Sequence, residues 1–582
     1  MFVEACVARW YHGFIILLLF PGICAVAVVA VAQSQQDVQV PVNLANYDWT
    51  DPPSVDATGN LIFSSVSGLL RHWPNALYRH GHNIVSATVG VGTLLYHGPT
   101  DNCTGHPPTE PDWASFDPEH SFIFSSRIYT FRVVRPLKVL YFDGSSAANM
   151  PTGTIDTQEI LSHGELRDGE WSREWARIKE MCEWGKQFGL DGFLRMEFDF
   201  EIEICDFTAG MEIISVLDLL PAFQDQGRPK PDCPNETSGS SNITNQSVNE
   251  DSSFRSRLIP PKNFPKSPTE ISRPKGWVGS QRPWSAVAFS VIDAGNCHNF
   301  PGLTSSVILD FTKLVSFFDI KYTSLVDARR EQKRGGYRVG NITREEAELA
   351  RAEIEGMLST WDIESDWKAN RIRWDGVIQT IVERYADRLE YLSMLLREVT
   401  DSDNGSRKMN VTETVQRTRW QVLTMLTMYM PATTKPPTRY KGRRMDTKWL
   451  GSTMHHCSTM DTAHINLAPF TTPERLLKGA IEAVTKEICR TLGIIWLDAF
   501  DIEGKPEVQQ KVLMAKWLKE MTSLKEWLGW YAWSDFTQCN PACGLHEMCT
   551  SPQWPLDIDS SGQGGDELFR PYCMSKWWGV GV

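Results

Sequence analysis

The sequence GLDGFLRMEFDFEIEICDF, from Gly189 to Phe207, decides how the first half of this chain folds. Its second part alternates between acidic residues, which are Glu197, Asp199, Glu201 and Glu203, and apolar residues, which are Phe198, Phe200, Ile202 and Ile204. Successive side chains of a strand point to opposite faces, so this pattern predicts a β-strand with one face on a core. The ordinary structural explanation is an edge strand whose acidic face lies in solvent and discourages edge-to-edge pairing.

Upstream of this strand, the sequence predicts a mixture of strands and helices. The apolar stretch GTLLYHG, from Gly92 to Gly98, ends in a histidine followed by a glycine, where a backbone can approach a ligand closely. Asp117 followed by Pro118 is typical of a helix start. The spacing of apolar residues over Trp171–Phe188 predicts a helix that ends at Gly189. We therefore expect an α+β domain over residues 61–223.

Several short segments of this region resemble the ADP-ribosyltransferase fold. They are Gly92–Gly98, FDPEHS (Phe116–Ser121), RPLKVLYFD (Arg135–Asp143), LDG (Leu190–Gly192) and EIEICD (Glu201–Asp206). In the branch of that family with a Tyr-His-Gly segment, the histidine contacts the adenosine ribose of NAD, and a glutamate on a late strand holds the nicotinamide ribose. The resemblance implies NAD as a substrate, bound by Tyr96, His97 and Gly98, with Glu201, or alternatively Glu203, as the catalytic carboxylate. A carboxylate there would stabilise the oxocarbenium-like sugar left when nicotinamide departs.

The first 32 residues have the composition of a targeting segment. Arg9 precedes an apolar run over Phe14–Ala32, which ends in Ala30-Val31-Ala32, a small-residue pattern suited to signal peptidase. Residues 1–32 are therefore predicted to be a signal peptide. The alternative is a retained signal anchor that would hold the chain on a membrane, because the run is just long enough to span a bilayer. Either way we expect the bulk of the chain in the secretory pathway, extracellular or lumenal.

The sequence offers acceptors for N-glycosylation, which agrees with that compartment. The seven Asn-x-Ser/Thr acceptors are Asn102, Asn235, Asn242, Asn245, Asn341, Asn404 and Asn410. Three of them fall in residues 224–283, a segment rich in Pro, Ser, Asn and Lys without apolar periodicity. We predict a disordered, glycosylated linker or insertion there.

Thirteen cysteines are present, two of them within residues 1–32. The odd remainder of eleven leaves one thiol free or paired between chains. Near the end of the chain, Cys539, Cys543, Cys549 and Cys573 predict two disulfides that staple a small segment over residues 536–582, with zinc as the alternative. The spacing does not decide which cysteines pair. For Cys457, which lies beside His455 and His456, a disulfide is favoured over metal binding in an oxidising compartment.

The remainder of the chain divides by its periodicity. Residues 33–60 are polar and predicted to form an extended lead-in. Residues 284–535 show the apolar spacing of helices and are predicted to be a helical domain. Its first helix is expected from Ser305, with an apolar stripe over Val307–Phe318, a basic C-terminal turn over Arg329–Arg334 and a stop at Gly335. Thr343 with Glu346 has the spacing of a capping box that opens the next helix. The predicted fold is thus an α+β domain, a mainly α-helical domain and a small disulfide-rich C-terminal segment.

Composition and overall resemblance limit the functions to be considered. The net charge of −13 argues against nucleic acid as a partner, and 42% hydrophobic residues indicate a globular protein. The segments LYHG, VLYFDG and PACG, beginning at Leu95, Val139 and Pro541, also resemble a family of hypothetical proteins from filamentous fungi without an established activity. Two hypotheses follow: a secreted enzyme that hydrolyses NAD or transfers ADP-ribose, and a non-catalytic glycoprotein of the cell surface or wall.

Overall fold

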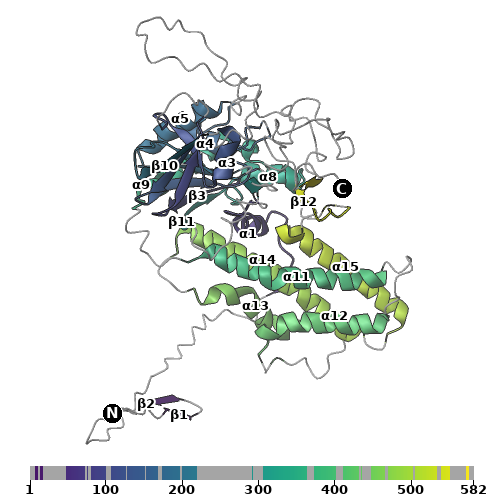
Figure 1. Ribbon diagram of the computed structural model, residues 1–582. Helices are drawn as coiled ribbons and strands as arrows, with labels where there is room; N and C mark the ends of the chain where they lie inside the picture. Colours follow the sequence, from purple (N-terminus) through teal and green to yellow (C-terminus); the bar gives the residue numbers. More distant parts are fainter. Residues whose placement is uncertain are drawn as a thin grey trace, which may run out of the picture.

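The computed structural model of the chain (Figure 1) describes the following residues. They are 7–10, 13–16, 48–72, 75, 80–99, 107–125, 127–150, 152–167, 173–196, 199–218, 291–292, 306–362, 372–400, 410–431, 434, 447–465, 470–502, 505–533, 539, 541–550 and 572–575. The predicted linker 224–283 lies outside them, as do five of the seven acceptor asparagines. Within predicted segment 1–32, two short paired strands are described, β1 (Val7–Trp10) and β2 (Gly13–Ile16).

A nine-stranded mixed sheet organises the first part of the chain. Its strands are β3 (Asn83–Val89), β4 (Leu94–His97), β5 (Asp112–Ser115), β6 (Arg127–Val133), β7 (Leu137–Phe142), β8 (Gly192–Met196), β9 (Phe200–Ile204), β10 (Met211–Asp218) and β11 (Val307–Ser316). They lie in the order β10-β6-β4-β5-β9-β8-β7-β3-β11. Only β7 and β8 run parallel; the other neighbouring strands are antiparallel.

Short helices cover one face of this sheet. They are α4 (Asp156–His163), α5 (Glu174–Lys186), α8 (Thr323–Arg330) and α9 (Arg344–Ser359). Their apolar residues, such as Ile160, Ile178 and Ile354, form one core with Leu140 and Phe193 of the sheet. A further short helix, α3 (Pro118–Phe124), follows β5 and begins with the predicted Asp117–Pro118 pair at its N-terminus.

Further helices, most of them longer, cover the opposite face and form the second part of the molecule (Figure 1). They are α1 (Gly59–Ser67), α11 (Trp374–Thr400), α12 (Val411–Leu426), α13 (Gly451–Ala463), α14 (Thr472–Asp501) and α15 (Glu507–Leu528). Single 3-10 turns occur at η6 (Arg334–Gly336), η7 (Val339–Asn341), η8 (Thr427–Tyr429), η9 (Lys448–Leu450) and η10 (Tyr531–Trp533). One continuous core joins Val85 and Ile202 of the sheet to residues of this bundle such as Ile381 and Leu492. The predicted α+β domain followed by a mainly helical region is confirmed.

The prediction of a helix over Val307–Phe318 is wrong, because these residues form strand β11. The strand pairs with β3 at the end of the sheet, and its register shifts between Asp310 and Leu314. The shift changes which residues face the bundle, so Val307, Phe311, Leu314 and Phe318 all pack into the same core. Their spacings of four, three and four residues imitate a helical stripe.

Side-chain caps begin two of the helices, and the first of these caps is the predicted one. The hydroxyl of Thr343 accepts a hydrogen bond from the backbone N–H of Glu346, at the start of α9. At the start of α14, Thr471 and Glu474 form a complete reciprocal capping box. Each such cap satisfies backbone donors that a helix leaves without partners, and contributes about 1 kcal/mol.

Four disulfides brace the described part of the chain. Cys182–Cys205 ties α5 to the residue after β9, and Cys457–Cys489 ties α13 to α14. Cys539–Cys549 and Cys543–Cys573 lie around a small two-stranded sheet of β12 (Glu547–Thr550) and β13 (Tyr572–Ser575). The two predicted C-terminal disulfides are present, with the pairing that sequence left open. No helix in the described residues combines the length and apolarity that crossing a bilayer requires.

Candidate functional site

Strand β9, which carries the acidic alternation, lies inside the sheet. It is paired on one side with β5 and on the other with β8. Glu201 is 8% exposed and Glu203 is fully buried. The explanation of the alternation as an edge strand with a solvated acidic face is therefore wrong. The acidic side of this strand points into the protein and needs partners there.

Arg195 of β8 supplies those partners. Its guanidinium is fully buried and donates from Nη2 to Oε1 of Glu201 at 2.5 Å and to Oε1 of Glu174 at 2.9 Å. Its Nη1 lies 2.8 Å from Oε1 of Glu203. A single guanidinium thus serves three carboxylates, two from β9 and one from α5. We call Arg195, Glu174, Glu201 and Glu203 the arginine–glutamate cluster.

The pairing of β8 with β9 explains why these side chains meet. Arg195 lies directly opposite Glu201, and Phe193 lies opposite Glu203. Cross-strand partners share a face of the sheet, so the arginine reaches both glutamates. At Gly192 a Cβ atom would lie 2.1 Å from the carbonyl oxygen of Glu203, so the absence of a side chain lets the two strands approach.

A second layer of polar side chains holds the cluster in place. The Nδ2 group of Asn149 donates to Glu174 at 2.8 Å, and its Oδ1 accepts from Nη2 of Arg177 at 2.6 Å. Gln158 of α4 accepts from Arg195 at 3.4 Å and donates to the backbone carbonyl of Ser146 at 2.6 Å. Arg177 and Gln158 are both fully or almost fully buried, so α4 and α5 contribute charge and hydrogen bonds as well as apolar cover.

The charges of the cluster shift its pKa values in defined directions. Burial raises the pKa of Glu201 to about 7, and the nearby charges of Glu174 and Glu203 add to this, against the lowering effect of Arg195. Burial also raises the pKa of Glu203, opposed by Arg195 and Arg177. For Arg195, burial lowers the pKa, but the three surrounding carboxylates outweigh it and the pKa is raised. Three carboxylates face two guanidinium groups here, so the cluster has a place for one proton near neutral pH.

This arrangement gives Glu201 the properties of a proton donor or acceptor. Its pKa lies near neutrality, as general acid–base chemistry requires. The side chains of Glu201 and Glu174 keep 11% and 15% of their surface exposed, whereas those of Arg195 and Glu203 have none. Solvent therefore reaches the cluster at Glu201 and Glu174.

His97 lies on the other face of the sheet. Tyr96 is paired with Ser115, which is paired with Glu201, so these three side chains share a face, and His97 follows Tyr96 on the same strand. The His97 ring contacts Phe207 and Tyr129, and Nδ1 is 2.7 Å from the carbonyl oxygen of Trp113. The described structure therefore does not bring His97 and Glu201 together on one wall.

The environment of His97 is that of a core histidine. It is 1% exposed, and burial lowers its pKa to about 4. Its Nε2 lies 3.9 Å from Asp112, whose pKa burial raises to about 7. At the next residue, Gly98, a Cβ would lie 2.5 Å from the carbonyl oxygen of Ser121. This glycine allows close packing against α3, so the structure gives the Tyr-His-Gly segment a packing role.

Sequence reasoning missed Arg195, Glu174, Arg177 and Asn149. The available signal was Arg195 itself, a charged residue between Leu194 and Met196 in an otherwise apolar strand. Such an arginine needs a buried anion. The acidic alternation that begins two residues later supplies two such anions, Glu201 and Glu203. Glu174 and Arg177 stand on the helix before the strand and could be placed only by tertiary packing.

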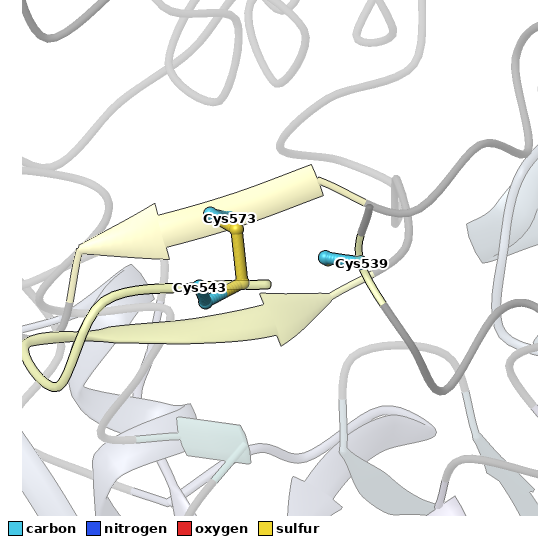
Figure 2. Close-up of side chains that lie close together, drawn as sticks. All are labelled: Cys539, Cys543 and Cys573. Atoms are coloured by element: carbon cyan, nitrogen blue, oxygen red, sulfur yellow. A yellow bond between two sulfur atoms is a disulfide. The ribbon is translucent and has the colours of Figure 1, made fainter. Parts of the chain in front are cut away.

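The cysteines form the other group with possible chemistry. Cys457, which lies beside His455 and His456, forms a disulfide with Cys489. Its sulfur is therefore not available as a metal ligand, as the alternative metal site would require. Near the end of the chain, the sulfur atoms of Cys539, Cys543 and Cys573 lie within 4.8 Å of one another (Figure 2). Figure 2 shows the bond between Cys543 and Cys573 with Cys539 beside it.

Fold and site together define a disulfide-bonded protein with a mixed-sheet domain that packs on a helical bundle and encloses an arginine–glutamate cluster. The chain matches the family model described as the YPL277C N-terminal domain over residues 125–252. This range contains all four residues of the cluster but not His97.

Two curated relatives are uncharacterized proteins of Saccharomyces cerevisiae, YOR389W and YPL277C. The chain is 30% identical to the first over 223 residues and 30% identical to the second over 224 residues. Each match covers 29% of this chain, and 35% and 45% of the two yeast proteins, so the chain spans less than half the length of these relatives. No solved structure matches it. These similarities support an uncharacterised fungal family, and give no support to the ADP-ribosyltransferase resemblance.

Proposed function

We propose that this chain is a glycoprotein of the secretory pathway that acts at the cell surface or outside the cell. The observation that carries the proposal is the state of its cysteines: all eight that the structure describes are paired in four disulfides. Disulfides of this kind persist in oxidising compartments and are rare where thiol reductants keep cysteines reduced. The predicted targeting segment and acceptor asparagines agree with this.

Both acceptor asparagines that the structure describes are accessible to a glycosyltransferase. Asn341 and Asn410 are exposed. Asn410 is the N-cap of α12, and its side-chain oxygen accepts from the backbone N–H groups of Thr412 and Glu413. A glycan attaches to the side-chain nitrogen, so glycosylation of Asn410 is compatible with its capping role.

We expect the chain, when expressed in a fungal secretory host, to carry N-glycans at Asn341 and Asn410. Enzymatic deglycosylation should increase its electrophoretic mobility, and Asn341→Gln and Asn410→Asp should each remove one glycan. Aspartate is chosen at position 410 because it keeps the N-cap acceptor and abolishes the acceptor sequence. A chain that carries no glycan, with its cysteines reduced in the cytosol, would contradict the proposal.

Between the two functional hypotheses, the geometry favours a glycoprotein without NAD chemistry. One NAD molecule would have to reach His97 with its adenosine ribose and Glu201 with its nicotinamide ribose, and these residues lie on opposite faces of the sheet. Access from both faces would require the strands between them to separate. The arginine–glutamate cluster then serves to join β8, β9 and α5.

The NAD hypothesis has a direct test in the glycosylated protein. We expect no nicotinamide release from NAD by the wild type above the level of a heat-denatured control. Release by the wild type that is lost in Glu201→Gln, and kept in Glu203→Gln, would instead establish an NAD-handling enzyme with Glu201 as its carboxylate. Circular dichroism of each variant would show that the protein compared is folded.

A further inference from the structure

The C-terminal segment places four cysteine sulfurs in one small volume. Cys549 of β12 and Cys573 of β13 are directly opposite each other in the two-stranded sheet. Each is bonded to a cysteine that precedes the sheet, Cys549 to Cys539 and Cys573 to Cys543. Three of the sulfurs lie within 4.8 Å of one another, and the fourth is covalently attached to one of those three.

This separation is close to what four thiolates need around one zinc ion. Zinc binds cysteine sulfur at about 2.3 Å in a tetrahedron, which puts neighbouring sulfurs roughly 3.8 Å apart. A disulfide holds its two sulfurs about 2 Å apart, so each bonded pair must open by less than about 2 Å, shared between two side chains. Cys539 and Cys543 also have the short spacing, three intervening residues, that zinc sites use for a first ligand pair.

We propose that the reduced C-terminal segment is a zinc site, with Cys539, Cys543, Cys549 and Cys573 as its four ligands. Disulfide and zinc forms exclude each other. Each of the two disulfides takes up two electrons and two protons from a small thiol reductant, which is oxidised to its own disulfide. The four resulting thiols give up their protons as Zn²⁺ binds, and leave four thiolates on the metal.

Accessibility makes the disulfides of this segment easier to reduce than the disulfide inside the helical bundle. All four of its cysteines are partly exposed, so a thiolate can reach them. In contrast, Cys457 and Cys489 are each 1% exposed, inside the packing of α13 on α14. A limited amount of reductant should therefore open the two C-terminal disulfides while the one in the helical bundle stays closed.

The test uses the full chain after brief treatment with a dithiol, with the reduced cysteines identified by alkylation and mass spectrometry. We expect the reduced wild type to bind about one zinc ion per chain, and Co²⁺ to give the visible absorption of tetrahedral thiolate coordination. Bound zinc should protect the four cysteines from alkylation. The double variant Cys539→Ser, Cys549→Ser keeps only two of the four ligands. Loss of a residue that merely hydrogen-bonds to a zinc ligand weakens metal binding by up to roughly 100-fold, so the loss of two ligands should weaken it by more.

The control is the reduced wild type whose cysteines are alkylated before zinc is added. It has the unchanged sequence but no free thiols, and should bind no zinc. If the reduced wild type takes up no zinc, or if the double serine variant binds it equally well, the assignment is wrong. The protection measurement needs no substitution, so a folding defect of the variant does not obscure the result. The zinc site is independent of the proposed secretory function, because glycan attachment tests that function separately.

Discussion

Replacing Arg195 by methionine is expected to lower the free energy of unfolding by about 3–5 kcal/mol at neutral pH. The methionine fills similar volume but leaves Glu174, Glu201 and Glu203 without the guanidinium that they share. Because Arg195 and Glu203 are fully buried, water cannot replace the lost partner. Urea denaturation of the two proteins at the same pH measures the difference.

The matched control for this variant is Arg132→Met in strand β6 of the same sheet. Arg132 also pairs with a glutamate, Glu212, but the two side chains are 52% and 46% exposed. Such an exposed ion pair contributes about 0–1 kcal/mol, so this replacement should have little effect. Equal losses in the two variants would contradict the role assigned to the arginine–glutamate cluster.

Replacing Glu201 by glutamine is expected to make the protein more stable than the wild type at pH 8, by about 3 kcal/mol. The pKa of Glu201 is about 7 in the folded protein, against an ordinary value of 4.5. The folded state therefore holds more protons than the unfolded state between these values, and stability falls as pH rises through this range. Glutamine stays neutral and can still accept from Arg195, so it avoids this loss.

The comparison between the two proteins measures Glu201 together with the neighbouring groups whose pKa values depend on its charge. The raised pKa of Asp112 acts in the same direction, while the lowered pKa values of His97 and His120, both about 4, cost stability as pH falls. The two histidines are unchanged in the variant, so their effects cancel in the difference. The charge of Glu201 is one cause of the raised pKa of Asp112, so the variant also relieves part of that shift, which adds to its advantage at high pH. Thermal unfolding from pH 4 to 8 should show similar stability at pH 4 and a growing advantage for glutamine above pH 5. A constant difference across this range would contradict the assignment.

These two predictions depend on the buried position of the arginine–glutamate cluster, which the local sequence pattern indicated only in part. Over Phe200–Ile204 the alternation correctly identified a strand, because the period of two is imposed by the backbone. It could not show whether the acidic face meets water or protein. That depends on β5 and β8, which pair with β9 from positions far away in the chain.

The same distinction between local and tertiary causes applies to Val307–Phe318 and to His97. Val307–Phe318 has the spacing of a helix, but a register shift within β11 produces that spacing in a strand. His97 and Glu201 each stand where the resemblance to ADP-ribosyltransferases suggested, on neighbouring parts of one sheet. A difference of one residue along β4 puts the histidine on the opposite face, and no short motif carries that information.

The sequence by itself determined the elements whose causes are local. Helix starts at Arg344 and Thr472 follow from capping residues that satisfy backbone groups within one turn, and the start at Pro118 follows from the fixed φ of proline at the first helical position. Apolar spacing within residues 284–535 likewise predicted helices, and the long helices Trp374–Thr400 and Thr472–Asp501 lie there. Only the tertiary structure decided the order of the strands, the pairing of the cysteines and the meeting of Arg195 with three glutamates. Each of these joins residues distant in sequence, so the free energy that selects them comes from packing and buried charge.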